Sequence, residues 1–358
     1  MEKIYPVAVK RSSPVFPGAV RKECFDAVND GKDSFRTAQA SDIAFNMLRH
    51  KALIRSGWTE FNQSLPQNEQ EVTTIECLPI LQAPAHEYDT LDTVVRRCMH
   101  ISAALGQQHT VLTVDQALYC KLVELQWAIP EYQKKLVVQL GDLHISMCFQ
   151  KATGNHMKGS GLVESWVESG LLGPNATEHV MNGKAYKRAM RAHKIALQSL
   201  WQLLMPFLLE FCQKSYIDLF QEISALARSP ENATDATALI TSLKSPRVKK
   251  ILEEFVAQRS EENVNFKFWW NYMEMVSILL MFTRAQREGI WDLYLHNFRH
   301  VMLPYFFRYN HLNYVRWGPV YIAEMEQLPK EVSKKGNFVV KWNESRSTRS
   351  VPITAFNG

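Results

Sequence analysis

Residues 110–144 read TVLTVDQALYCKLVELQWAIPEYQKKLVVQLGDLH, and they contain two short aliphatic runs separated by a stretch with helical spacing. A third aliphatic run and another helical stretch precede them, from residue 71 onward. Runs that are apolar on both faces are typical of parallel strands covered by helices. The sequence therefore predicts a β-α-β-α-β unit over residues 71–144, with its segments at Val72–Leu81, Thr90–Leu105, Thr110–Asp115, Ala117–Ile129 and Lys135–Leu140.

The rest of the chain has a different pattern. Over residues 145–330 the apolar residues recur with the period of a helix, which predicts an all-α domain. Residues 1–70 are broken by prolines and predict an irregular segment with one short helix, Ser41–Arg55. Residues 331–358 predict a tail with one strand, Phe338–Trp342. We thus expect an α/β core with a short parallel sheet next to a large all-α domain, and a mainly helical chain overall.

The composition excludes several classes of protein. The 358 residues are 46% hydrophobic and 22% charged, which excludes wholesale disorder, and the net charge is +5. Met1–Lys10 lacks the apolar run of a signal peptide, and the longest apolar stretch, Met275–Phe282, is too short to cross a bilayer. The six cysteines form no CxxC pair, as expected of reduced thiols. We expect an intracellular protein, in the nucleus or cytoplasm, that does not enter a membrane.

Two aspartates follow predicted strands, Asp115 after the second strand and Asp142 after the third. The carboxyl ends of parallel strands face the ligand crevice of an open sheet. Two carboxylates there could share Mg²⁺ or Mn²⁺, as a metal-dependent nuclease requires, and no other cofactor is expected. An Asp after a strand more often caps the next helix, so the metal-binding and capping interpretations both stay open.

A cationic stripe lies in the predicted all-α domain, and a smaller basic cluster follows at residues 244–250. The stripe recurs at helical spacing, with alanines on another side of the same helix. Such a stripe can follow the phosphate backbone of DNA or RNA, with an affinity that falls as salt rises. A solvated helix face is the commoner explanation of such runs. The stripe is a candidate nucleic-acid site made of Lys184, Lys187, Arg188, Arg191 and Lys194.

Several phrases of the sequence resemble a multi-copy family of animal proteins of mobile-element origin, without an established activity. The resemblance covers most of the chain, and it is carried by VLTVDQALY, LGDLHISM, LLGPNA, KAYKRAMRAHK, GNFVVK and the long run FTRAQREGIWDLYLHNFRHVMLPYFFRYNHLNYVRWGPVYIAEMEQLP. It implies a fold similar to the RNase H-like core of DDE-type transposases. Such cores carry one Asp on the first strand, a second after the fourth and a Glu on a late helix. Some insert a helical domain between the fifth strand and that helix.

On this pattern Thr110–Val114 is the fourth strand, Leu136–Leu140 is the fifth, residues 145–330 are the insertion, and Asp115 is the second acid. Longer relatives carry an acidic segment before this chain's start and a Glu-bearing helix beyond its end, and the family often has Gly in place of Asp142. The resemblance therefore implies a chain truncated at both ends, with an incomplete RNase H-like core.

The expected function is that of a catalytically inactive transposase remnant that binds nucleic acid through the cationic stripe. Two alternatives remain. One is a helical protein–protein interaction scaffold that self-associates through its aromatic-rich helices. The other is a metal-dependent nuclease that uses Asp115 and Asp142.

Overall fold

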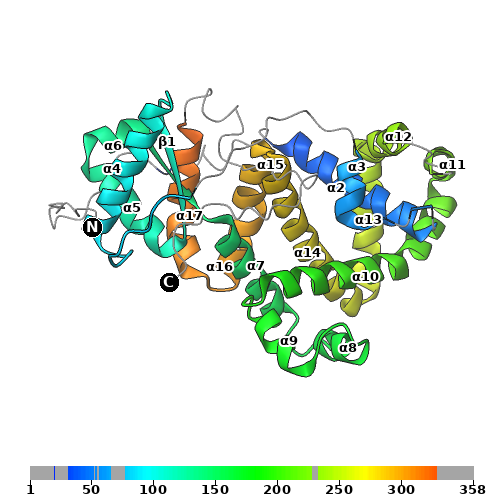
Figure 1. Cartoon of the computed structure of the whole chain (residues 1–358). Helices are drawn as coiled ribbons and strands as arrows, with labels where there is room; N and C mark the ends of the chain where they lie inside the picture. Colours follow the sequence, from blue (N-terminus) through cyan, green and yellow to red (C-terminus); the bar gives the residue numbers. More distant parts are fainter. Residues whose placement is uncertain are drawn as a thin grey trace. The chain divides into compact units, whose positions relative to one another are not determined.

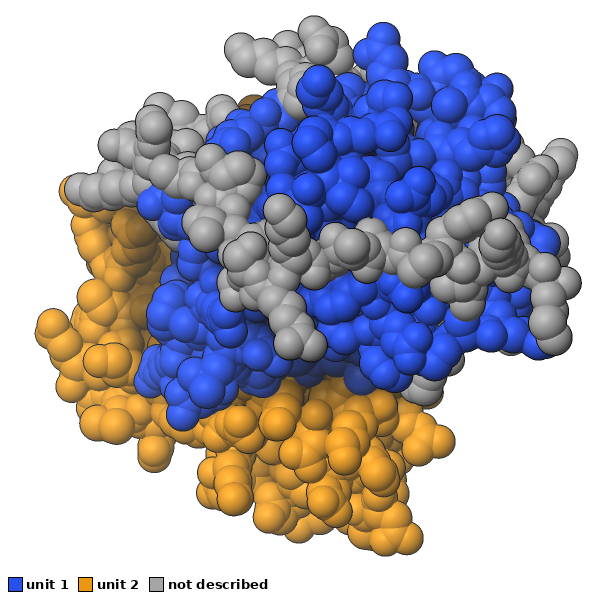
Figure 2. Space-filling model, turned by 90° about the vertical axis from the view of Figure 1, so that its left-hand side faces the viewer, with its two compact units in different colours: residues 1–28, 72–148, 284–358 blue, residues 29–71, 149–283 orange. Residues whose placement is uncertain are grey.

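A computed structural model of the chain describes residues 20, 31–51, 53–54, 56–65, 77–227 and 233–328. The chain divides into two compact units (Figure 2). Unit 1 takes its described residues from 1–28, 72–148 and 284–358, and unit 2 takes its own from 29–71 and 149–283. Each unit is therefore assembled from segments that are far apart in the sequence.

Two parallel strands form the centre of unit 1. β1 (Thr110–Val114) pairs with β2 (Leu136–Leu140) in register from end to end. Every residue of β2 is buried, as expected of a strand that is covered on both faces. The pairing ends at Gly141, whose N–H donates to the carbonyl oxygen of Val114 at 2.6 Å. A Cβ at residue 141 would lie 3.0 Å from that oxygen, so glycine suits this close approach.

Local sequence accounts for the helices next to the strands. α5 (Gln116–Ala128) connects β1 to β2 and packs on β2, while α4 (Tyr88–Ala104) packs on β1 and α5. α6 (Pro130–Lys135) begins with a proline, whose missing N–H removes no helical hydrogen bond at that position. The predicted strand-helix-strand order over residues 110–140 is confirmed.

Helices from much later in the chain complete unit 1. Tyr119 of α5 meets the rings of Trp317 and Tyr321 edge to face, at centroid distances of 6.1 and 6.0 Å. Figure 1 shows the helix that carries these two rings close to α5 and β1. The late elements are α15 (Trp291–His296), the π-helix η1 (Asn297–Met302), α16 (Leu303–Arg308) and α17 (Leu312–Glu326).

The predicted strand Val72–Leu81 is corrected by the structure. Residues 77–81 form no strand, and residues 72–76 lie outside the described residues. Pro79 cannot donate a ladder hydrogen bond, and Leu78 and Ile80 point their apolar side chains toward solvent. Within the described part of the chain the sheet has two strands, and helices make up most of the structure.

Two expected boundaries also differ, and one expected element lies outside the described residues. Residues 284–326 were expected in the all-α domain, and they group with the strands of unit 1. The N-terminal segment was expected to be irregular up to residue 40, but α2 begins at Lys32, directly after Gly31 with its positive φ of 84°. The expected tail strand, Phe338–Trp342, lies outside the described residues.

Every secondary-structure element among the described residues of unit 2 is a helix. α7 and α14 each contain a boundary between the units, so they belong to both. The helices are α2 (Lys32–His50), α3 (Trp58–Ser64), α7 (Asp142–His156), α8 (Leu162–Glu168), α9 (Pro174–Met181), α10 (Tyr186–Ser215), α11 (Ile217–Leu226), α12 (Ala233–Leu243), α13 (Pro246–Glu262) and α14 (Val264–Glu288).

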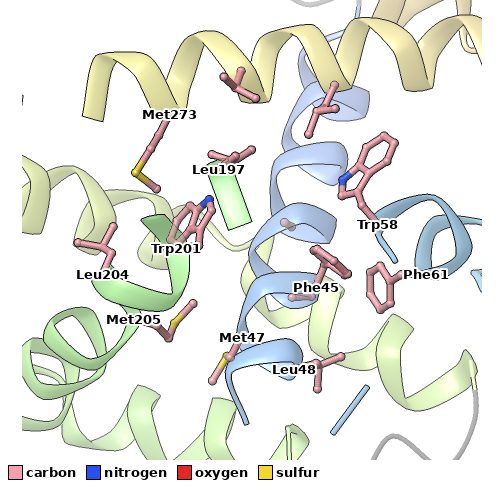
Figure 3. Close-up of a cluster of buried hydrophobic side chains, with 14 of the residues drawn as sticks. Phe45, Met47, Leu48, Trp58, Phe61, Leu197, Trp201, Leu204, Met205 and Met273 are labelled. Atoms are coloured by element: carbon pink, nitrogen blue, oxygen red, sulfur yellow. The ribbon is translucent and has the colours of Figure 1, made fainter. Parts of the chain in front are cut away.

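One hydrophobic cluster holds unit 2 together. Figure 3 shows side chains from α2, α3, α10 and α14 converging in it. The rings of Phe45 and Phe61 are 5.5 Å apart, and Trp201 meets Trp270 edge to face at 6.0 Å. Such aromatic pairs add about 0.5–1.5 kcal/mol each beyond the area that they bury. Bulky packing between helices therefore dominates this unit.

α10 has two unlike halves. By length and composition alone it could cross a membrane, and it is the one helix among the described residues of which this is true. Its first turns carry cations on one side, and further along it inserts Leu197, Trp201 and Met205 into the core of unit 2. Leu203 and Phe207 of the same stretch are exposed, so only part of its apolar surface is buried in unit 2.

A close approach between helices accounts for Gly154 inside α7. A Cβ at residue 154 would lie only 2.1 Å from the carbonyl oxygen of Met181, at the end of α9. Glycine inside a helix costs about 0.5–1 kcal/mol relative to alanine, so its presence here is explained by this contact and not by helix propensity. The contact fixes α9 against α7 within unit 2.

We predict that Gly154→Ala lowers the free energy of unfolding by about 1–3 kcal/mol, because the backbone of Met181 must shift to admit a methyl group. Urea denaturation of the full chain measures this change. Gly57→Ala is the matched control, because nothing lies within 4 Å of a Cβ there; its effect should stay below about 1 kcal/mol. Equal stability of the two variants would contradict the α7–α9 contact.

Candidate functional site

Asp115 lies between β1 and α5 and caps the helix. Its side-chain oxygen accepts a hydrogen bond from the N–H of Leu118 at 2.8 Å. The first N–H groups of a helix have no partner within the helix, and an Asp in this position satisfies one of them. The carboxylate that the sequence offered as a metal ligand therefore has a structural partner.

Asp142 begins α7, directly after Gly141 at the end of the strand pair. Its carboxyl group is buried, and the residue as a whole is half-buried. The hydroxyl of Tyr294, from α15, donates a hydrogen bond to it. Burial raises the pKa of Asp142 to about 7, and the Tyr294 hydrogen bond acts in the opposite direction. At neutral pH this carboxyl group is thus protonated in a large fraction of the molecules.

A chain of buried polar side chains connects Asp142 to the strands. The hydroxyl groups of Tyr294 and Tyr321 are 3.1 Å apart. Tyr321 in turn interacts with Gln139 of β2, which accepts a hydrogen bond from Thr113 of β1 at 2.9 Å. Burial is the main reason that the pKa of each tyrosine lies far above its usual value, so both remain neutral hydrogen-bond donors. The chain of contacts ties late helices to the sheet.

A second acid, the half-buried Glu324 of α17, was not identified from the sequence. It accepts hydrogen bonds from the Tyr119 hydroxyl and the Trp127 indole N–H, both at 2.9 Å. Burial raises the pKa of Glu324 to about 7, while the bonds from Trp127 and Tyr119 lower it. Its partners are 205 and 197 residues away in the chain, so no local pattern could have connected them.

The surroundings of the acids can be compared with what a metal ion needs. Burial raises the pKa of Tyr314 well above its usual value, and Cys148 raises it further. The charges of Asp115 and Asp142 act in the same direction, so both acids lie near this hydroxyl group. No three Asp, Glu, His or Cys side chains among the described residues are grouped to hold an ion. The structure gives each acid one hydrogen-bond donor, the Leu118 N–H at Asp115 and the Tyr294 hydroxyl at Asp142.

We predict that stability depends on pH through Asp142. Its pKa is about 7 in the folded chain and near 3.8 when exposed, so the unfolded chain releases the proton first as pH rises. The folded state therefore loses stability between pH about 4 and pH about 7. Asp142→Asn cannot titrate, so its loss of stability from pH 5 to pH 8 should be smaller than that of the wild type by about 2–3 kcal/mol.

Urea unfolding at the two pH values measures this difference. Asp218→Asn serves as a control, because Asp218 is exposed and its pKa is lowered by its hydrogen bond with Arg247. An unchanged pH dependence in Asp142→Asn would contradict the buried, protonated state of this carboxyl group.

Four of the five residues of the predicted cationic stripe are exposed and form no ion pair within the described residues. We call Lys184, Lys187, Arg188 and Arg191 the cationic face; all four are exposed. Within the described residues none of them forms an ion pair. The opposite side of α10 is buried through small residues, among them Ala189 and Ala192. The face thus carries four unneutralised charges, with Lys184 just before α10 and the other three in its first two turns.

Lys194, the fifth residue of the predicted stripe, has a different role. Its Nζ donates to the hydroxyl of Thr59 at 3.1 Å and lies 5.0 Å from the ring centre of Trp58. Both partners belong to α3, in unit 2. Lys194 is half-buried and holds α10 against α3, so the structure separates it from the cationic face.

The smaller basic cluster at residues 244–250 is neutralised by carboxylates. An exposed ion pair contributes little stability, but it leaves little net charge for a phosphate to meet. The pairs are Lys244 with Asp33 at 2.6 Å, Arg247 with Asp218 at 2.7 Å, Lys249 with Glu253 at 3.4 Å and Lys250 with Glu254 at 3.8 Å.

A pocket of about 530 Å³ opens next to Arg188 and Arg191. Its wall comes from residues 171–176, which form the turn before α9 and its first residues, and from α10. The exposed side chains of Asn175 and His179 also line it. Residues 171–176 (LLGPNA) entered the sequence analysis only through the family resemblance, because a turn has no periodic pattern that would predict a pocket.

A family model described as a domain of unknown function, DUF8702, matches residues 57–348. The match takes in every described element from α3 to α17 and therefore both units. No curated protein and no solved structure matches the chain.

Proposed function

The chain belongs to the DUF8702 family of domains of unknown function, and we propose that it binds nucleic acid through the cationic face of α10 without cutting it. We further propose that it descends from an RNase H-like, DDE-type transposase. The binding proposal depends on α10 in unit 2, and the proposed descent depends on the segments that form unit 1.

The observation that carries the binding proposal is the contrast between two basic clusters of the same unit. Four cations of the cationic face are exposed and unpaired within the described residues, while those at residues 244–250 all have carboxylate partners. Unpaired Lys and Arg on one helix face attract phosphates, and releasing the counterions of a nucleic acid drives binding.

The layout of the chain supports the proposed descent. β1 and β2 are parallel, Asp115 follows β1, and residues 149–283 interrupt the segments that form unit 1. A helical insertion after the fifth strand would produce this arrangement. The late helix α17 brings Glu324 into unit 1, but that acid is bound by Tyr119 and Trp127.

The competing proposal of a metal-dependent nuclease is less well supported. Asp115 is used as a helix cap, and Asp142 is buried with a pKa raised to about 7. Metal ligation requires deprotonated carboxylates, and a hard cation needs several oxygen ligands at once. These two acids serve the fold in the arrangement seen here.

We predict salt-dependent binding of a labelled oligonucleotide by the full chain, measured by fluorescence anisotropy between about 50 mM and about 200 mM salt. The triple variant Lys187→Glu, Arg188→Glu, Arg191→Glu should weaken binding by at least about tenfold and make its salt dependence shallower, because each phosphate contact contributes about 0.7–0.9 to the slope. Circular dichroism checks that the variant is folded.

The charge-matched control is the triple variant Arg247→Glu, Lys249→Glu, Lys250→Glu, which changes the net charge by the same amount at paired positions. It should reduce affinity far less. Equal losses in the two variants would mean that net charge alone drives binding, and absence of any binding would remove the proposal. Salt-insensitive oligomers in sedimentation, without oligonucleotide binding, would instead favour the interaction-scaffold alternative.

A further inference from the structure

The pocket next to the cationic face has one charged side and one apolar side. We call it the α9–α10 pocket. Arg188 and Arg191 are three residues apart on α10, so their guanidinium groups reach the pocket from the same side. The apolar side is formed by Leu171, Leu172 and Pro174.

The charged side suits a phosphate group. Arginine presents several N–H donors in a planar fork that matches phosphate oxygens, and these two arginines have no carboxylate partner within the described residues. The start of α9 lies in the same wall, and its N-cap, Gly173, provides no side-chain hydrogen bond to the first turn. Its peptide N–H groups add to the positive potential without forming a site alone.

The other side suits a nucleobase. Leucine and proline side chains provide apolar contact for a base face, and the amide of Asn175 and the imidazole of His179 each combine donor and acceptor capacity for a base edge. A volume of about 530 Å³ is much more than a phosphate alone would fill. It lies within the range of about 300–1,000 Å³ that is typical of small-molecule sites.

We propose that the α9–α10 pocket holds one unpaired nucleotide of a single-stranded nucleic acid, with its phosphate at Arg188 and Arg191 and its base against Leu171, Leu172 and Pro174. The proposal rests on the proposed function and makes it more specific. A base inside a duplex is stacked and paired, so it cannot enter a side pocket, whereas a single strand can present its bases freely. Lys187 and Lys184 then meet the neighbouring phosphates.

The test compares three ligands with the full chain: a single-stranded oligonucleotide, a single strand of the same length built from abasic nucleotides, and the duplex. The intact single strand should bind at least about tenfold more tightly than the abasic strand, because only the latter lacks the base. The double variant Asn175→Ala, His179→Ala should reduce this preference severalfold and leave abasic binding unchanged. Both side chains are exposed, so the fold should persist.

Lys187→Glu is the matched control, because Lys187 belongs to the cationic face but does not line the pocket. It should weaken the binding of intact and abasic strands by the same factor.

Equal binding of intact and abasic strands by the wild type would overturn the pocket assignment and leave the cationic face in place. Adenosine monophosphate that displaces the strand as readily as unlabelled strand would assign the pocket to a free nucleotide, and it would also overturn the proposal. Absence of binding to all three ligands would defeat the proposed function itself.

Discussion

The parallel pairing of β1 with β2 is the interaction on which unit 1 depends. Parallel strands cannot be joined by a tight turn, so α5 has to cross over between them and lies against the sheet. Within the pair, Thr113 and Gln139 are partners in register, and Gln139 is buried. A buried amide must be hydrogen-bonded, and Tyr321 of the late helix α17 joins this network. The same polar contacts continue through Tyr294 to Asp142.

This arrangement separates structural acids from available cations. Burial raises the pKa values of Asp142 and Glu324 to about 7, and each accepts hydrogen bonds from aromatic side chains. They contribute to the fold of unit 1, where an ionised carboxylate would be expensive to bury. The unneutralised positive charges are instead gathered at the start of α10, in unit 2. The structure therefore gives little support to catalysis at the sheet. Nucleic-acid binding at α10 is supported by both exposed charge and a pocket.

Part of the fold of unit 1 could be predicted from local sequence. The runs TVLTV and LVVQL are β-branched or aliphatic, and a capping aspartate follows the first, so strand, cap and crossover helix were predictable. The predicted strand Val72–Leu81 contains Pro79. The pattern of its side chains overestimated the tendency of this segment to pair with another strand. The return of residues 284–326 to the strands was not predictable, because it depends on contacts such as Tyr119 with Glu324 across 205 residues. Spacing predicted the cationic face but could not show that Lys194 is held by Thr59 and Trp58.

The central claim is that the strand pair and the late helix α17 form one cooperative unit, distinct from unit 2. Hydrogen–deuterium exchange of the full chain at increasing sub-denaturing urea tests it most directly, because amides of one cooperative unit lose protection together. Residues 110–114, 136–140 and 312–326 should become exchangeable at the same urea concentration, and Asp142→Asn at pH 8 should shift all three to higher urea together. Exchange of 312–326 at a clearly lower concentration than the two strands would contradict the account.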